Sequence, residues 1–135
     1  MNLHIPKPVY DEESKPFWEG LNNDELLIQQ CRSCHKNIFY PRSFCPNCFS
    51  EEIQWKKASG KGKIYSYTVV HHAFGPFKEE TPFIVGIVEL DEGVRMLTRI
   101  IGERNQVQID KEVTVVFQRI SEDFTLPYFM LSNAN

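Results

Sequence analysis

The sequence lacks several features that mark common protein classes. No apolar run approaches the roughly 20 residues that cross a bilayer. The opening MNLHIPKPVYDEE has no basic segment followed by an apolar one, as a secretory signal does. Basic residues are not in excess, because 15 Lys and Arg stand against 18 Asp and Glu. These absences predict a cytoplasmic chain without a membrane span, and they disfavour nucleic acid as a ligand.

Recognisable catalytic signatures are absent as well. The chain contains no G-x-S-x-G, no H-E-x-x-H and no phosphate loop of the Walker type. Catalysis requires a nucleophile or an acid–base pair held at fixed positions, and no such constellation can be read from the sequence. We therefore predict no catalytic residues, and leave an autonomous enzyme as an open alternative.

The most informative feature present is the set of four cysteines, which lie in two C-x-x-C pairs. Ten residues (35–44) separate the pairs, enough for a short hairpin that brings the two turns together. Two such turns form a tetrahedral S4 site, and reduced cytoplasmic thiols favour metal binding over disulfides. We predict a structural zinc ion bound by Cys31, Cys34, Cys45 and Cys48. A closed S4 site has no open position at which to activate water.

Other interpretations of these cysteines remain open. Residues 31–35 match C-x-x-C-H, the haem attachment pattern, but that chemistry usually follows export and leaves the second pair unexplained. A dithiol redox centre is possible, although no βαβ pattern surrounds either pair. An S4 ligand set also suits iron, so zinc and iron both stay open.

The secondary-structure pattern changes along the chain. We expect an extended arm, then a short helix capped by Ser14 and ended by Gly20 and residues 22–23, with Pro16 in its first turn. A strand at 25–30 leads to the first cysteine, and residues 39–42 form a return hairpin. After Trp55 the apolar period becomes two, which is typical of strands.

Five strands are expected in the second half of the chain, at 63–71, 83–90, 94–101, 112–119 and 124–131. The segment 83–90 is almost entirely apolar, so we predict burial on both its faces, whereas 112–119 alternates. Gly93 supplies a positive φ in the loop 91–93, and Pro127 marks an edge or a bulge. The count and spacing predict a mainly β protein ending in a five-stranded barrel of the OB type.

The ordered set of these motifs resembles the DUF35 family. It comprises Phe17-Trp18, ELLIQQC, the first C-x-x-C, Phe39-Tyr40-Pro41-Arg42, Cys45-Pro46-Asn47-Cys48, Trp55, the segment 60–68 and the segment 88–93. The resemblance implies a rubredoxin-like zinc ribbon and an OB domain, with boundaries that we place at 1–24, 25–58 and 59–135. It also implies an accessory subunit that pairs with thiolase-like or hydratase-like proteins and helps to bind acyl-CoA.

Two positions depart from the family's pattern. His35 and Phe49 stand where such ribbons usually carry Gly after the second cysteine of each turn. Residues 109–111 lack the Gly that often precedes the fourth barrel strand. Asp110 tolerates turns, so we expect this turn to be kept.

Several residues are candidates for ligand or partner contacts, each with a plainer alternative. Lys61 and Lys63 can neutralise a phosphate or lie in an ordinary connecting turn. Arg95 and Arg99 share one strand face and either meet coenzyme A phosphates or are solvated. Arg42 follows Pro41 beside the cysteine hairpin. The aromatic rings of the loop 71–82, Phe74 and Phe77, either contact a ligand or a partner or fold back on the core.

Three functions therefore compete. The first is the non-catalytic, acyl-CoA-binding scaffold subunit that the resemblance implies, with a homo-oligomer as a possible assembly. The second is a nucleic-acid-binding module, for which Lys56, Lys57, Lys61 and Lys63 offer a local basic stripe. The third is an autonomous enzyme such as an acyl-CoA hydrolase.

Overall fold

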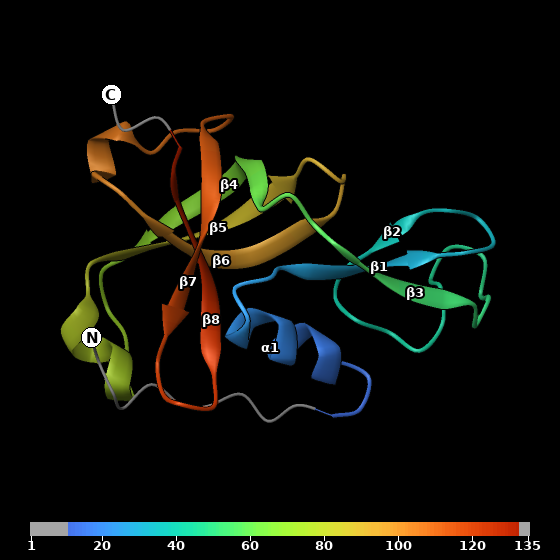
Figure 1. Cartoon of the computed structure of the whole chain (residues 1–135). Helices are drawn as coiled ribbons and strands as arrows, with labels where there is room; N and C mark the ends of the chain where they lie inside the picture. Colours follow the sequence, from blue (N-terminus) through green and yellow to red (C-terminus); the bar gives the residue numbers. More distant parts are fainter. Residues whose placement is uncertain (1–10, 133–135) are drawn as a thin grey trace.

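Residues 11–132 form one α-helix, a small three-stranded sheet and a five-stranded barrel (Figure 1). The structure is a computed structural model, and it describes residues 11–132. The predicted extended arm lies mainly outside the described residues. Within 11–132, no helix has the length and apolar character needed to cross a membrane.

The first helix, α1, spans Lys15–Asn22 and packs between the two sheets, where it contacts β1 and β8. Pro16 lies in its first turn, as expected. The expected Ser14 side-chain cap is wrong, because the Ser14 hydroxyl bonds Asp11 Oδ1 at 3.1 Å and makes no cap bond. Gly20 does not end the helix either. A Cβ at Gly20 would lie 2.9 Å from the Leu27 side chain, so the glycine permits close packing on β1.

The small sheet has the order β2-β1-β3 and is antiparallel throughout. Its strands are β1 (Leu27–Cys31), β2 (Asn37–Ile38) and β3 (Ile53–Lys57). The pairing of Cys31 with Ile53 places the end of β1 against the start of β3, so both C-x-x-C turns lie at one end of this sheet. Strand β3 was not expected from the sequence, in which Trp55 marked only the point where the apolar period becomes two.

The barrel is closed in the order β4-β5-β6-β8-β7. Its strands are β4 (Lys61–Val70), β5 (Phe83–Leu90), β6 (Arg95–Ile101), β7 (Glu112–Arg119) and β8 (Thr125–Leu131). All pairs are antiparallel except β6 with β8, which is parallel. The predicted mainly β class and the five-stranded barrel are confirmed.

Burial along β5 differs from the prediction. We expected both faces of 83–90 to be buried, but only alternate residues are fully buried, and those between them are half-buried. The reason is that β5 lies in a barrel wall, so one face meets the core and the other meets the outer surface. The prediction for β7 is confirmed, since Val113 is fully buried and Val115 and Phe117 pack on the core.

Two short 3₁₀ helices lie between strands, η1 (Gly75–Glu80) in the loop 71–82 and η2 (Arg104–Gln106) between β6 and β7. The turn residues behave as their chemistry suggests. Gly93 has φ +88°, and Asp110 has φ +71°, so Asp110 does replace glycine in the turn before β7.

Candidate metal centre and ligand cleft

The four cysteines converge at the end of the small sheet that is remote from the barrel. Their Sγ atoms all lie within 4.8 Å of one another. Cys31 Sγ lies 3.5 Å from Cys48 Sγ, and Cys34 Sγ lies 3.6 Å from Cys45 Sγ. A regular tetrahedron of sulfur atoms about 2.3 Å from a zinc ion has edges of about 3.8 Å. The cluster is therefore consistent with a structural metal such as zinc, and its donor set fits that ion.

The two cysteine turns have the same backbone geometry. His35 N donates to Cys31 O at 2.9 Å, and Phe49 N donates to Cys45 O at 2.8 Å. His35 and Phe49 both have φ +66°, the left-handed region that favours glycine. The departure from glycine at these positions therefore leaves the turn intact, at a cost of roughly 1–2 kcal/mol for each residue.

Backbone N–H groups stabilise thiolates in the cluster. Ser33 N and Cys34 N each lie 3.4 Å from Cys31 Sγ, and Asn47 N lies 3.4 Å from Cys45 Sγ. The hydrogen bond from the Cys34 N–H lowers the pKa of the Cys31 thiol to about 6. The backbone N–H of Lys36 lowers the pKa of Cys34 in the same way. The first cysteine pair is therefore prepared to release thiol protons to a metal ion. The Ser50 N–H lowers the pKa of Cys48, but burial and the neighbouring thiols outweigh it and raise this pKa to about 11.

A largely apolar cleft of about 410 Å³ lies where α1, the small sheet and the barrel meet. Its walls come from residues 17–18 of α1, residues 39–40 after β2, residues 96–99 of β6 and residues 126–128 of β8. The Phe17 ring makes edge contacts with Trp18, Phe39 and Tyr40 at centroid distances of 5.0, 5.5 and 5.9 Å. Trp18 Nε1 donates to the Tyr40 hydroxyl at 3.2 Å.

The cleft exists because β6 and β8 separate along part of their length. Their backbones pair only at Ile100 with Phe129 and Ile101 with Met130. Closer to α1, Pro127 has no N–H to donate, and the Thr98 hydroxyl bonds its carbonyl at 2.7 Å instead. Pro127 therefore stands at an unpaired edge of β8, as the sequence suggested.

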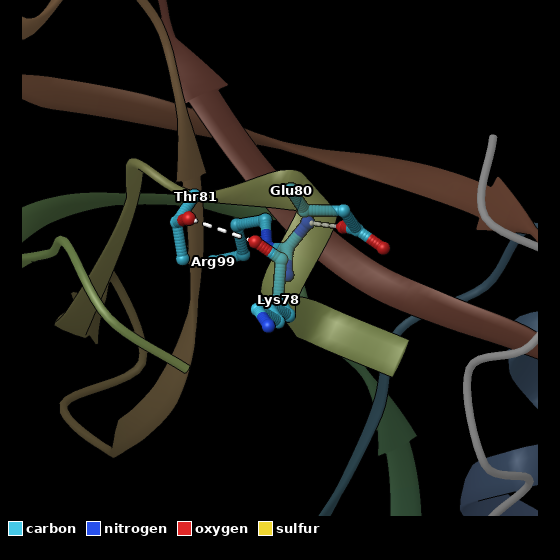
Figure 2. A network of polar contacts seen from close by, with 4 residues as sticks. All are labelled: Lys78, Glu80, Thr81 and Arg99. Atoms are coloured by element: carbon cyan, nitrogen blue, oxygen red, sulfur yellow. Dashed lines mark hydrogen bonds and ion pairs between the residues drawn. The ribbon is translucent and has the colours of Figure 1, made fainter. Parts of the chain in front are cut away.

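Arg99 forms the charged edge of this cleft. Its guanidinium lies 4.1 Å from the centre of the Phe83 ring and 5.4 Å from that of Tyr128, and Nη1 donates to Glu80 Oε1. Figure 2 shows this pair, with Glu80 reaching from η1 to the outer face of β6. Burial raises the pKa of the Tyr128 phenol, and the nearby Arg99 offsets this only in part. Tyr128 therefore remains a neutral phenol near neutral pH.

The other cationic candidates lie elsewhere. Arg95 shares the outer face of β6 with Arg99, but it contacts Glu89 at 3.1 Å and covers the Tyr65 ring at 3.8 Å. Lys63 lines a separate hollow of about 390 Å³ together with Glu89, Asp91 and Glu112. These carboxylates interrupt the proposed basic stripe. A ligand role for Arg95, Lys61 and Lys63 stays a prediction.

The two loop aromatics have different environments. Phe74 is 93% exposed, whereas Phe77 is half-buried against a small apolar cluster of Ile120, Phe124 and Leu126. The Phe77 ring packs on the barrel, and a ligand or partner role for it stays a prediction. The exposed Phe74 remains free to contact another molecule.

The backbone of Arg42 is fixed by Gln29, a buried residue of β1. Gln29 Nε2 donates to Arg42 O at 2.9 Å, and Arg42 N donates to Gln29 Oε1 at 2.7 Å. These bonds join the segment between the two cysteine turns to the small sheet. The Arg42 side chain is exposed, so its contact role stays a prediction.

Replacing Gln29 with leucine is expected to lower the free energy of unfolding by about 1–3 kcal/mol, because two backbone groups of Arg42 lose their buried partner. The measurement is urea denaturation with the metal present. Gln108→Leu, at an exposed loop position, is the matched control. Equal midpoints for the two variants would count against this role of Gln29.

Three residues near Arg99 were not among the candidates. Tyr128 lines the cleft, Glu80 bonds Arg99, and Arg104 lines a neighbouring hollow. No local signal marked them, because they come from different loops and strands.

Comparison with known proteins places the sequence in a family. The model described as ChsH2, rubredoxin-like zinc ribbon domain, matches residues 18–54, and the model described as ChsH2, C-terminal OB-fold domain, matches residues 55–118. A solved structure titled Ltp2-ChsH2(DUF35) aldolase contains a similar chain. The TM-score is 0.86 with 30% identity, over 94% of this chain and 100% of that chain.

Curated relatives carry several descriptions. A DUF35 domain-containing scaffold protein of Methanocaldococcus jannaschii is 40% identical over 109 residues, which cover 78% of this chain and 77% of the relative. A probable enoyl-CoA hydratase alpha subunit of Thermomonospora curvata is 32% identical over 125 residues, or 92% of this chain. The benzoylsuccinyl-CoA thiolase subunit BbsA of Geobacter metallireducens is 31% identical over 111 residues, covering 82% of this chain and 66% of the relative.

The lengths of these relatives differ. The match spans 39% of the hydratase subunit but 77% of the scaffold protein. The region that these relatives share with this chain therefore occurs both as part of a longer subunit and as most of a shorter protein. Sequence matches across both halves and the close structural match agree: the chain belongs to the DUF35 family, whose ChsH2-like members join a rubredoxin-like zinc ribbon to an OB-fold domain.

Proposed function

We propose that this protein is an accessory subunit that binds acyl-CoA and docks on a thiolase-like or hydratase-like enzyme. The relatives named as a scaffold protein, a hydratase alpha subunit and a thiolase subunit support this role. The structural observation that carries it is the apolar cleft between α1, the small sheet and the barrel, with the Arg99 guanidinium at its edge. An apolar cleft with one cation suits a ligand that has both an apolar chain and anionic groups.

The chain's own residues would hold and orient the ligand rather than react with it. The rings of Phe17, Trp18 and Phe39 exclude water from the cleft. The phenol of Tyr128 remains protonated and can donate a hydrogen bond. The metal supplies structural support, because four cysteine ligands leave no open position for substrate.

A second function, nucleic-acid binding, has less support. Lys63, one of the four lysines that suggested it, shares its hollow with Glu89, Asp91 and Glu112. Binding to a phosphate backbone requires a continuous positive groove. A salt-sensitive shift of single-stranded DNA or RNA by the purified chain would revive this alternative.

The test is purification of the tagged full chain from its native extract, with and without added octanoyl-CoA, followed by mass spectrometry. We expect one larger chain of the thiolase or hydratase type, and acyl-CoA retained by the complex. The untagged chain is the control for non-specific capture. Recovery of neither a larger acyl-CoA enzyme nor any acyl-CoA would contradict the proposal.

A further inference from the structure

The Arg99 side chain lines two hollows, and apolar residues make up most of the lining of both. On one side is the apolar cleft, in which Arg99 is the only charged residue among those that line it. On the other side is a smaller hollow of about 260 Å³ between β4, β5 and the loop that follows β6. One guanidinium therefore borders both spaces, and a single ligand can reach across it.

The smaller hollow is electropositive. Its two charged lining residues are Arg99 and Arg104, and none of the residues that line it is acidic. Arg104 is exposed at the start of η2, and no ion pair to it occurs within residues 11–132. Two guanidinium groups without a shared carboxylate attract phosphate or carboxylate oxygens, which their planar forks bind in pairs.

The Glu80 carboxylate already forms an ion pair with Arg99. It bonds Arg99 through Oε1, while its buried Oε2 has no hydrogen-bond partner within the described residues (Figure 2). The segment that carries Glu80 has no fully buried residue, and its Phe77 ring packs on the barrel. Rotation of the Glu80 side chain is enough to release Arg99, so the segment itself can stay in place.

We propose that the two hollows form one site for acyl-CoA, in which phosphate groups bind Arg99 and Arg104 and the pantetheine and acyl parts lie in the apolar cleft. The carboxylate of Glu80 competes with the phosphate for Arg99 and is displaced when acyl-CoA binds. This proposal rests on the function proposed above and adds the direction in which the ligand lies, with its anionic end at η2 and its apolar end at the small sheet.

The test measures octanoyl-CoA binding by calorimetry, on the full chain and on the complex recovered from native extract. Arg104→Gln and Arg99→Gln are expected to weaken binding about tenfold or more, because each removes a charge-assisted bond to phosphate. Glu80→Gln is expected to tighten binding about two- to fivefold, the range that partly exposed ion pairs reach. Arg119→Gln is the control, because Arg119 is an exposed arginine that lines neither hollow; a change under about twofold is expected.

Coenzyme A and octanoate test the phosphate-binding part and the apolar part of the site separately. Coenzyme A should lose affinity in Arg104→Gln as octanoyl-CoA does, whereas octanoate, which lacks the phosphates, should bind weakly to every form. Binding by Arg99→Gln is interpreted only if its melting temperature shows that the variant is folded. If Arg99→Gln unfolds, Arg104→Gln is the decisive variant, because Arg104 is exposed.

The outcomes distinguish this site from the general function. If wild-type protein binds octanoyl-CoA and both Arg104→Gln and Glu80→Gln bind it equally well, the two-hollow site is wrong and the accessory function stands. If neither the chain nor its complex binds octanoyl-CoA, the acyl-CoA part of the proposed function fails and the site fails with it. Weakening by Arg119→Gln as large as by Arg104→Gln would also overturn the site, because it would show a non-specific charge effect.

Discussion

The Cys45→Ser variant is expected to lose its bound metal and to unfold the small sheet. Cys45 is fully buried, and its Sγ is one of four within 4.8 Å of one another. Three remaining thiolates and a poorly coordinating hydroxyl bind zinc far less tightly, and metal-binding free energy in such small units is also folding free energy. The loss should amount to several kcal/mol, since structural zinc contributes about 10–16 kcal/mol of binding free energy in isolated zinc fingers.

The measurement is metal stoichiometry by elemental mass spectrometry, together with the melting curve. Ser33→Ala is the control, because Ser33 lies in the other cysteine turn and is exposed. Ser33→Ala should keep one metal ion per chain and the wild-type melting temperature. A Cys45→Ser protein that also keeps both would show that the cluster is not a structural metal site.

The Phe17→Ala variant is expected to be the most damaging change outside the metal centre. The Phe17 ring is 2% exposed and contacts three other rings, which belong to α1 and to the segment after β2. Removing a buried phenyl ring costs about 3–5 kcal/mol, from lost burial and from the cavity that remains. For a chain of 135 residues this corresponds to a fall in melting temperature of about 10 °C or more.

The same substitution should weaken octanoyl-CoA binding even at a temperature where the variant is folded, because Phe17 lines the cleft and supports Trp18 and Tyr40. Glu19→Ala, on the exposed side of α1, is the control and should change stability by less than about 0.5 kcal/mol. Thermal unfolding and calorimetry of both variants test the prediction. Similar melting temperatures for the two would indicate that α1 is not held by this aromatic cluster.

Several features could be predicted because they depend on short-range geometry. Two residues between cysteines produce a turn that directs both thiols to one point, so the sequence alone indicated the metal cluster. The period of two along 63–71 and 112–119 indicated strands of the barrel, and Gly93 indicated a tight turn. The helix boundary was harder, because Gly20 is there for contact with Leu27, which lies on a different element.

Two of the candidate ligand residues could not be distinguished from the sequence. Arg95 and Arg99 look alike in sequence, since both lie on the same face of one strand. In the structure Arg95 meets Glu89 on the neighbouring strand β5, whereas Arg99 meets Glu80 from a loop 19 residues away in sequence. Local pattern fixes the face of a strand, but it does not specify which loop folds over that face.

The sequence by itself determined the cysteine turns and the five barrel strands, because turn chemistry and strand alternation act over a few neighbouring positions. Only the tertiary structure decided that rings from α1, from the segment after β2 and from β8 enclose one cleft with Arg99 at its edge. The physical reason is that β6 and β8 pair only at Ile100 with Phe129 and Ile101 with Met130, and distant segments pack in the space beside their unpaired parts.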